Sequence, residues 1–178
     1  MQTEAKIVEL DLNQVAKQNL WATILLTIGF VIFNMVLHGN YSLSFHFLDV
    51  LYLSALYIVL IILHEAFHLI GFMIFGGVKF HELDYGVNLK LGVAYATTTK
   101  PLANHAMKKA LLLPFWVTGL VPALFGFYFN SFLLVIVGAL LIAGAIGDFI
   151  MYKELRKFPK DSLIKDDPKL PRLYVYEK

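Results

Sequence analysis

Four long apolar stretches constrain this chain more than any other feature. They run over residues 20–37, 48–75, 110–129 and 131–152, and each is close to or longer than the roughly 20 residues that a helix needs to cross a bilayer. Charged residues make up 16% of the chain and hydrophobic residues 58%, whereas an ordinary soluble domain has about 25% charged residues. The sequence therefore predicts an α-helical integral membrane protein with four transmembrane helices in the lipid bilayer.

The distribution of lysine and arginine predicts the orientation of these helices. The segment between the second and third spans carries five lysines, and basic residues such as Lys153 and Arg156 follow the fourth span. The loops around residues 39–47 and at Asn130 carry no lysine or arginine. Because basic loops stay on the cytoplasmic side, we expect a multi-pass protein of the cell membrane with both termini in the cytoplasm.

The composition excludes several kinds of site. The chain has no cysteine, so disulfides and thiolate ligands are excluded, and a metal must be held by histidine and carboxylate. The net charge of +2 and the lack of a basic tract argue against a nucleic-acid partner. The length predicts one membrane-embedded domain over residues 1–152. Residues 153–178 hold three prolines among charges and predict a flexible cytoplasmic tail.

Between the second and third spans, residues 78–99 have a different pattern. From Leu83 to Tyr95 every odd position is apolar or aromatic, and strict alternation is typical of a β-strand. The alternation slips near His81, which predicts a turn or bulge there. We therefore expect a small β-hairpin or sheet on the cytoplasmic side.

The motif that carries chemistry lies in the second span, where residues 64–68 read HEAFH. Positions i and i+4 project from one face of a helix, so His64 and His68 can bind one metal ion. Glu65 follows the first histidine and can reach a water molecule at that metal. The structural alternative is a set of buried polar side chains satisfied by hydrogen bonds, although ionisable groups at membrane depth usually mark function.

A hydrolytic zinc site needs a third protein ligand, and Asp148 is the ionisable candidate in another span. His64 lies sixteen residues after Leu48, and Asp148 lies seventeen after Ser131. At about 1.5 Å per residue, both lie ~24–26 Å from the outer ends of their helices. Small residues before Asp148, including Gly144, favour close helix packing. The alternative for Asp148 is a carboxylate that extends toward a helix end.

Three segments together resemble the putative zincin peptidase family, small bacterial membrane proteins related to the site-2 protease class. They are HEAFH, the Gly147-Asp148 pair and the stretch AYATTTKPLANHAMKKALLLP between them, and the resemblance extends over residues 60–152. It implies one zinc ion per chain, held by His64, His68 and Asp148, with Glu65 as the catalytic base. Better-known site-2 enzymes carry an NPDG- or LDG-like motif at their aspartate, where this chain has AIGDF.

These observations predict an intramembrane zinc metalloendopeptidase. It would hydrolyse a peptide bond in or near a transmembrane segment of a membrane protein or peptide, using zinc-activated water and Glu65 as general base. Tyr95, Asn104 and His105 are weak candidates for binding the substrate or the oxyanion. The alternating segment fits two roles equally well, a strand edge for the unwound substrate or a folded cap.

Two other functions fit the same residues. One is a non-catalytic zinc-binding membrane scaffold, or pseudoprotease, and the other is a metal carrier. Neither needs a carboxylate beside its ligands, whereas a hydrolase does. Glu65 therefore discriminates between these hypotheses.

Overall fold

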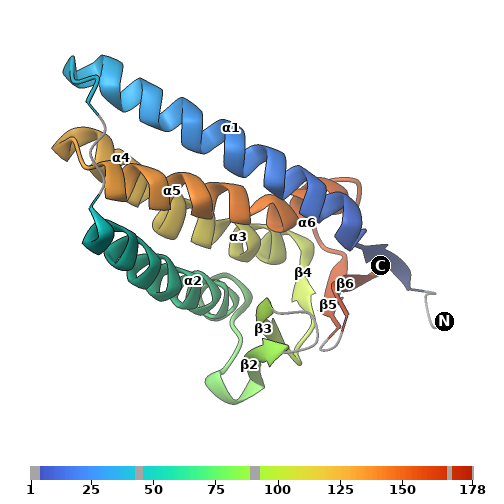
Figure 1. Cartoon of the computed structure of the whole chain (residues 1–178). Coiled ribbons are helices and arrows are strands. Elements are labelled where there is room, and N and C mark those ends of the chain that lie inside the picture. Colours follow the sequence, from blue (N-terminus) through green and yellow to red (C-terminus); the bar gives the residue numbers. More distant parts are fainter. Residues whose placement is uncertain (1–4, 43–45, 89–92, 168–169, 178) are drawn as a thin grey trace. The chain divides into compact units, whose positions relative to one another are not determined.

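The computed structural model of this chain describes residues 5–42, 46–88, 93–167 and 170–177 (Figure 1). Within these residues, four helical segments are long and apolar enough to cross a membrane: Leu12–His38, Phe47–Gly76, Asn104–Phe129 and Phe132–Leu155. The prediction of four long apolar helices is confirmed. The first, helix α1 (Leu12–His38), begins eight residues earlier than predicted, because its polar first turns lie outside any window chosen for apolar residues.

The second segment is the single helix α2 (Phe47–Gly76), whereas the third and fourth are interrupted. The third consists of helix α3 (Asn104–Pro114), the π-helical segment η2 (Phe115–Leu120) and helix α4 (Val121–Phe129). Proline has no N–H and disturbs the helix before it, so Pro114 and Pro122 should each kink this segment. The wider π-helical turns lie between these two prolines.

The fourth segment breaks at Ala145, between helix α5 (Phe132–Gly144) and helix α6 (Ile146–Leu155). The Ala145 amide donates to the Leu141 carbonyl at 3.1 Å, and α6 then starts a new helical run. The sequence predicted one continuous helix over residues 131–152. Helix α5 ends at Gly144, and glycine is about 1 kcal/mol less favourable than alanine inside a helix.

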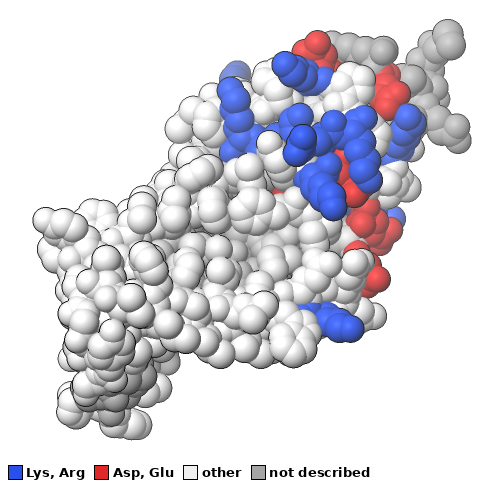
Figure 2. All heavy atoms as spheres, turned by 90° about the horizontal axis from the view of Figure 1, so that it is seen from above, with Lys and Arg blue, Asp and Glu red and all other residues white. Residues whose placement is uncertain are grey.

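The chain divides into two compact units. The apolar unit comprises Asn13–His64 and Phe115–Ile146, and the polar unit comprises Met1–Leu12, Glu65–Pro114 and Gly147–Lys178. Of the 15 lysines and arginines and 13 aspartates and glutamates in the chain, all but Lys17 and Asp49 belong to the polar unit. On the face drawn in Figure 2, most of the charged side chains that are visible lie close together, and broad areas carry none.

In the apolar unit, α4 and α5 form a tight hairpin. Asn130 turns the chain in the left-handed region (φ 53°), and the Ser131 side chain caps the start of α5. Glycines allow the two backbones to approach closely. A Cβ built on Gly138 would lie 2.7 Å from the Cβ of Ala123, and one on Gly126 would lie 2.6 Å from the Val135 amide nitrogen.

In the polar unit, four short strands that are distant in sequence form one antiparallel sheet in the order β1-β6-β5-β4. The strands are β1 (Lys6–Glu9), β4 (Leu102–Ala103), β5 (Leu163–Asp166) and β6 (Arg172–Tyr176). The prediction of a flexible tail after residue 152 was therefore wrong. Helix α6 continues to Leu155, and two strands of the C-terminal segment are part of the fold.

Apolar side chains of this sheet pack into the core of the polar unit. Val8, Ile164 and Val175 from three strands are buried with Phe72 of α2 and Leu155 of α6. Burial of such side chains stabilises a fold by about 1.5–3 kcal/mol each. The C-terminal strands therefore help to hold α2 and α6 in place within this unit.

The predicted hairpin is confirmed as strands β2 (Leu83–Asn88) and β3 (Val93–Thr98), although residues 89–92 lie outside the described chain. The predicted turn near His81 is the 3₁₀ helix η1 (Phe80–Glu82). Thr97 of β3 donates a hydrogen bond to the Asp166 carboxylate of β5 at 2.7 Å. This bond links the hairpin to the four-stranded sheet.

Burial of Asp166 has a consequence for stability. It raises the pKa of this carboxyl to about 6 from its usual 3.8, and the hydrogen bond from Thr97 opposes the rise. The folded state then binds a proton more tightly than the unfolded state between these two values. Asp166 should therefore make the fold less stable as pH rises from about 4 to about 6.

We expect Asp166→Asn to remove this part of the pH dependence, because asparagine can still accept the Thr97 hydrogen bond but does not ionise. The measurement is the melting temperature of both proteins in detergent between pH 4 and 7. The difference in Tm between variant and wild type should increase in favour of the variant across this range. A constant difference would show that Asp166 has no raised pKa.

Candidate metal centre

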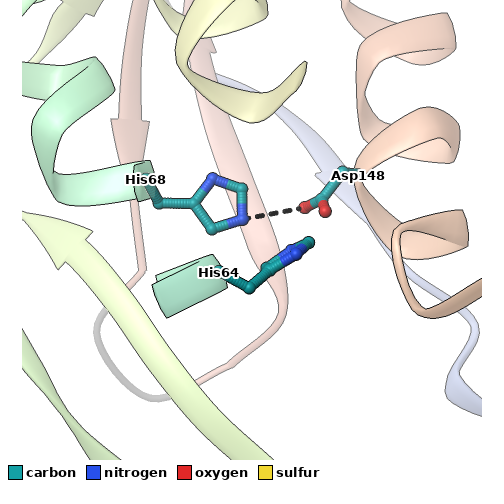
Figure 3. Close-up of side chains that lie close together, drawn as sticks. All are labelled: His64, His68 and Asp148. Carbon is teal, nitrogen blue, oxygen red and sulfur yellow. Dashed lines mark ion pairs between the residues drawn. The ribbon is translucent and has the colours of Figure 1, made fainter. Parts of the chain in front are cut away.

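Helix α2 positions the HExxH motif. His64 and His68 are both buried and lie one helical turn apart on α2, so the helix itself sets their separation (Figure 3). Glu65 is half-buried and lies about 100° further round the helix from His64. The helix thus presents two imidazoles on one face and a carboxylate beside them.

Asp148 lies in the first turn of α6, directly after the break at Ala145. A carboxylate is favoured there because the N-terminal end of a helix carries partial positive charge. The helix break is itself supported in the apolar unit, where the Asn19 side-chain amide donates to the Ala143 carbonyl at 3.2 Å. The break therefore gives Asp148 a local environment that a continuous helix would not provide.

The structure brings the predicted ligands together. The Asp148 Oδ1 atom lies 3.4 Å from His68 Nε2, and one ligand atom from each of His64, His68 and Asp148 lies within 4.8 Å of the others. Ligands at about 2.0–2.2 Å from a tetrahedral zinc ion are separated by about 3.4 Å. Two imidazoles and one carboxylate form the ligand set of a catalytic zinc site, which keeps a fourth position open. The residues present fit a zinc ion.

Hydrogen bonds orient both imidazoles. His68 Nδ1 lies 3.2 Å from the Ala110 carbonyl oxygen, and His64 Nδ1 lies 3.2 Å from the Thr118 hydroxyl. A zinc ligand of this type uses one ring nitrogen for the metal and the other for such a bond, which fixes the ring. In His68 the other ring nitrogen, Nε2, faces the Asp148 carboxylate.

These orienting groups were not predicted from the sequence. Ala110 acts through its backbone, and Thr118 lies fifty-four residues from its histidine. The sequence did contain one related signal, because Pro114 and Pro122 each lie four residues after one of these two positions. By themselves the two prolines indicate kinks in a helix and do not identify a histidine partner.

The three weak candidates for substrate binding contact residues other than His64, His68 and Asp148. The buried Asn104 amide donates to the carbonyls of Leu155, Phe158 and Pro159, at 2.9–3.0 Å, where α6 ends. His105 bonds the Lys160 carbonyl and is exposed. Tyr95 packs across the hairpin on Gly86. Their use by a substrate stays a prediction.

The protein is helical, and its site combines an HExxH motif on one helix with an aspartate from a later helix, as expected of a metallopeptidase. The chain belongs to the putative zincin peptidase family, whose model matches residues 57–163. The matched segment contains all four of the predicted ligand and base residues. Comparisons with curated proteins and with solved structures found no match.

Removing one ligand should abolish tight zinc binding. Losing only the hydrogen-bond partner of a zinc ligand costs about 10–100-fold in affinity, so His68→Ala should weaken zinc binding by more than about 100-fold. His105→Ala is the matched control, because His105 is exposed and outside the cluster. Zinc content by mass spectrometry and affinity by chelator competition measure the effect. Equal affinities for the two variants would exclude His68 as a ligand.

Asn104→Ala should destabilise the protein without changing zinc affinity. The substitution removes a side-chain donor from three carbonyls, of which those of Leu155 and Pro159 keep a backbone donor. We therefore expect a loss of about 1–3 kcal/mol. Thermal unfolding in detergent measures the loss, and chelator competition on the folded variant provides the comparison. An unchanged Tm would show that the hydrogen bonds from Asn104 at the end of α6 do not stabilise the fold.

Proposed function

We propose that this protein is an intramembrane zinc metalloprotease of the site-2 type, which cleaves a membrane protein or peptide in or near a transmembrane segment. One observation carries this proposal: the HExxH motif and Asp148 converge within helices that are long and apolar enough to cross a bilayer. Membership of the putative zincin peptidase family supports the metallopeptidase activity.

The exposed surface of the helices supports a membrane location. Large apolar side chains such as Leu25 of α1 (66% exposed), Ile62 of α2 (62%) and Leu124 of α4 (54%) face outward. Water would disfavour this surface by about 25 cal/mol per Å², whereas lipid would cover it. The lysines between the second and third helices favour a cytoplasmic position for the hairpin and for both termini.

His64, His68 and Asp148 would hold the zinc ion. A bound zinc ion would act as a Lewis acid toward the scissile carbonyl and lower the pKa of a water molecule to about 7. Glu65 would accept the proton of the attacking water and pass it to the leaving amine. Its place directly after His64 on the same helix, beside the proposed ligands, supports this role.

The hairpin supports a way of holding the substrate. A peptide bond in a helix is hidden by its own hydrogen bonds, so the substrate must unwind before cleavage. Among the described strands, β2 pairs with β3 on one side and with no strand on the other. Its Tyr85 and Val87 are 60% and 64% exposed. An unwound substrate would add to this edge as a further strand.

Glu65→Gln tests the catalytic proposal. Loss of a general base typically lowers the rate by about 10²–10⁴-fold, so we expect at least a 100-fold fall in cleavage while zinc affinity stays within about threefold. Quenched fluorescent single-span peptides in liposomes report cleavage, and chelator competition reports zinc.

Glu9→Gln on the exposed strand β1 is the matched control and should cleave like the wild type. If Glu65→Gln cleaves as fast as wild type, Glu65 is not the base. A wild-type protein that binds zinc but cleaves none of the peptides would favour a zinc-binding scaffold instead.

A further inference from the structure

Within the polar unit, a proline lies four residues after the carbonyl that orients a proposed zinc ligand. Ala110 and Pro114 are both on α3 and both buried, and the Ala110 carbonyl faces His68 Nδ1 at 3.2 Å. We propose that Pro114 is a positioning residue for the metal centre: it withholds the amide that would otherwise bond Ala110, and so commits that carbonyl to His68. This inference rests on the proposed zinc function.

The first step of the argument is helix chemistry. In an α-helix the amide of residue i+4 donates to the carbonyl of residue i, so the donor for Ala110 would be the amide at position 114. Proline has no N–H, and its ring also presses against the carbonyl four residues earlier and tilts it from the helix axis. A buried carbonyl deprived of its donor needs another partner. His68 provides one.

The second step concerns the tautomer of His68. A carbonyl oxygen can only accept a hydrogen bond, so the bond to Ala110 requires the proton on Nδ1. On the other side of the ring, Nε2 lies 3.4 Å from Asp148 Oδ1, where a zinc ion would replace its proton. With the metal bound there, the Ala110 carbonyl would keep the remaining proton on Nδ1 and so orient the ring.

The third step explains how α3 comes close enough to α2. Gly71 lies three residues after His68, and a Cβ built there would be 2.8 Å from the Ala110 Cα atom and 3.0 Å from its Cβ. Because real Cβ atoms do not approach so closely, any larger residue at position 71 would push the two helices apart. Gly71 and Pro114 therefore act on the same hydrogen bond, one through distance and the other through the missing donor.

A pair of substitutions at position 114 tests the missing N–H directly. Pro114→Ala restores an amide that competes for the Ala110 carbonyl. Replacement of Pro114 by lactic acid, introduced by nonsense suppression, has the alanine side chain and an ester oxygen in place of N–H. The two variants differ in one backbone group, so a change in helix bending from loss of the ring is common to both.

We expect Pro114→Ala to bind zinc about 10–100-fold more weakly than wild type, and the lactic acid variant to remain within about threefold. Chelator competition in detergent measures both affinities. In the zinc-loaded proteins, ¹⁵N chemical shifts of His68 should show the tautomer with the proton on Nδ1 in wild type and in the ester, and a shift away from it in the alanine variant. Far-UV circular dichroism checks that each variant is folded.

Equal zinc affinity in the alanine and lactic acid variants, or an unchanged tautomer in Pro114→Ala, would overturn the inference. Gly71→Ala provides a second test, since it should disturb the same tautomer by separation alone. These readouts are independent of proteolysis. A protein that cleaves no substrate would contradict the proposed function, while the tautomer measurements would still decide the role of Pro114.

Discussion

A buried carbonyl that loses its helical amide needs another donor, and side chains bond carbonyls at three places where helices of this protein are interrupted or end. At Pro114 the missing amide is replaced by His68, one of the residues that could hold a metal ion. At the break before Asp148, the Asn19 amide bonds the Ala143 carbonyl. At the end of α6, Asn104 bonds three carbonyls, of which those of Leu155 and Pro159 also accept backbone amides. In an apolar environment an unpaired carbonyl costs several kcal/mol, so these side chains stabilise the interruptions.

The two units differ in their content of charged residues. The motif HEAFH lies where α2 changes from one unit to the other, with His64 the last residue of the apolar segment and Glu65 the first of the polar segment. Almost all the charged residues of the chain belong to the polar unit.

The sequence was sufficient to predict the features that depend on local periodicity. Long apolar runs predicted the four helices, alternation predicted β2 and β3, and the spacing of His64 and His68 predicted one shared helix face. The four-stranded sheet was missed because its partners are remote: Lys6 pairs with Val175, and β4 has two residues. The roles of Thr118 and Ala110 were missed because a hydrogen-bond partner in space leaves no periodic signal in the chain.

The two carboxylates of the site differ in a way that supports their proposed roles. Asp148 has a short side chain, and its Oδ1 atom lies 3.4 Å from His68 Nε2, within the group of residues that could hold a metal ion. Glu65 is on the same helix as both histidines and lies about 100° round the helix from His64, beside the face that they share. If Glu65 bound the metal as well, the open position that hydrolysis requires would be lost. This helical geometry supports the proposal, in which Asp148 would hold the metal and Glu65 would transfer the proton.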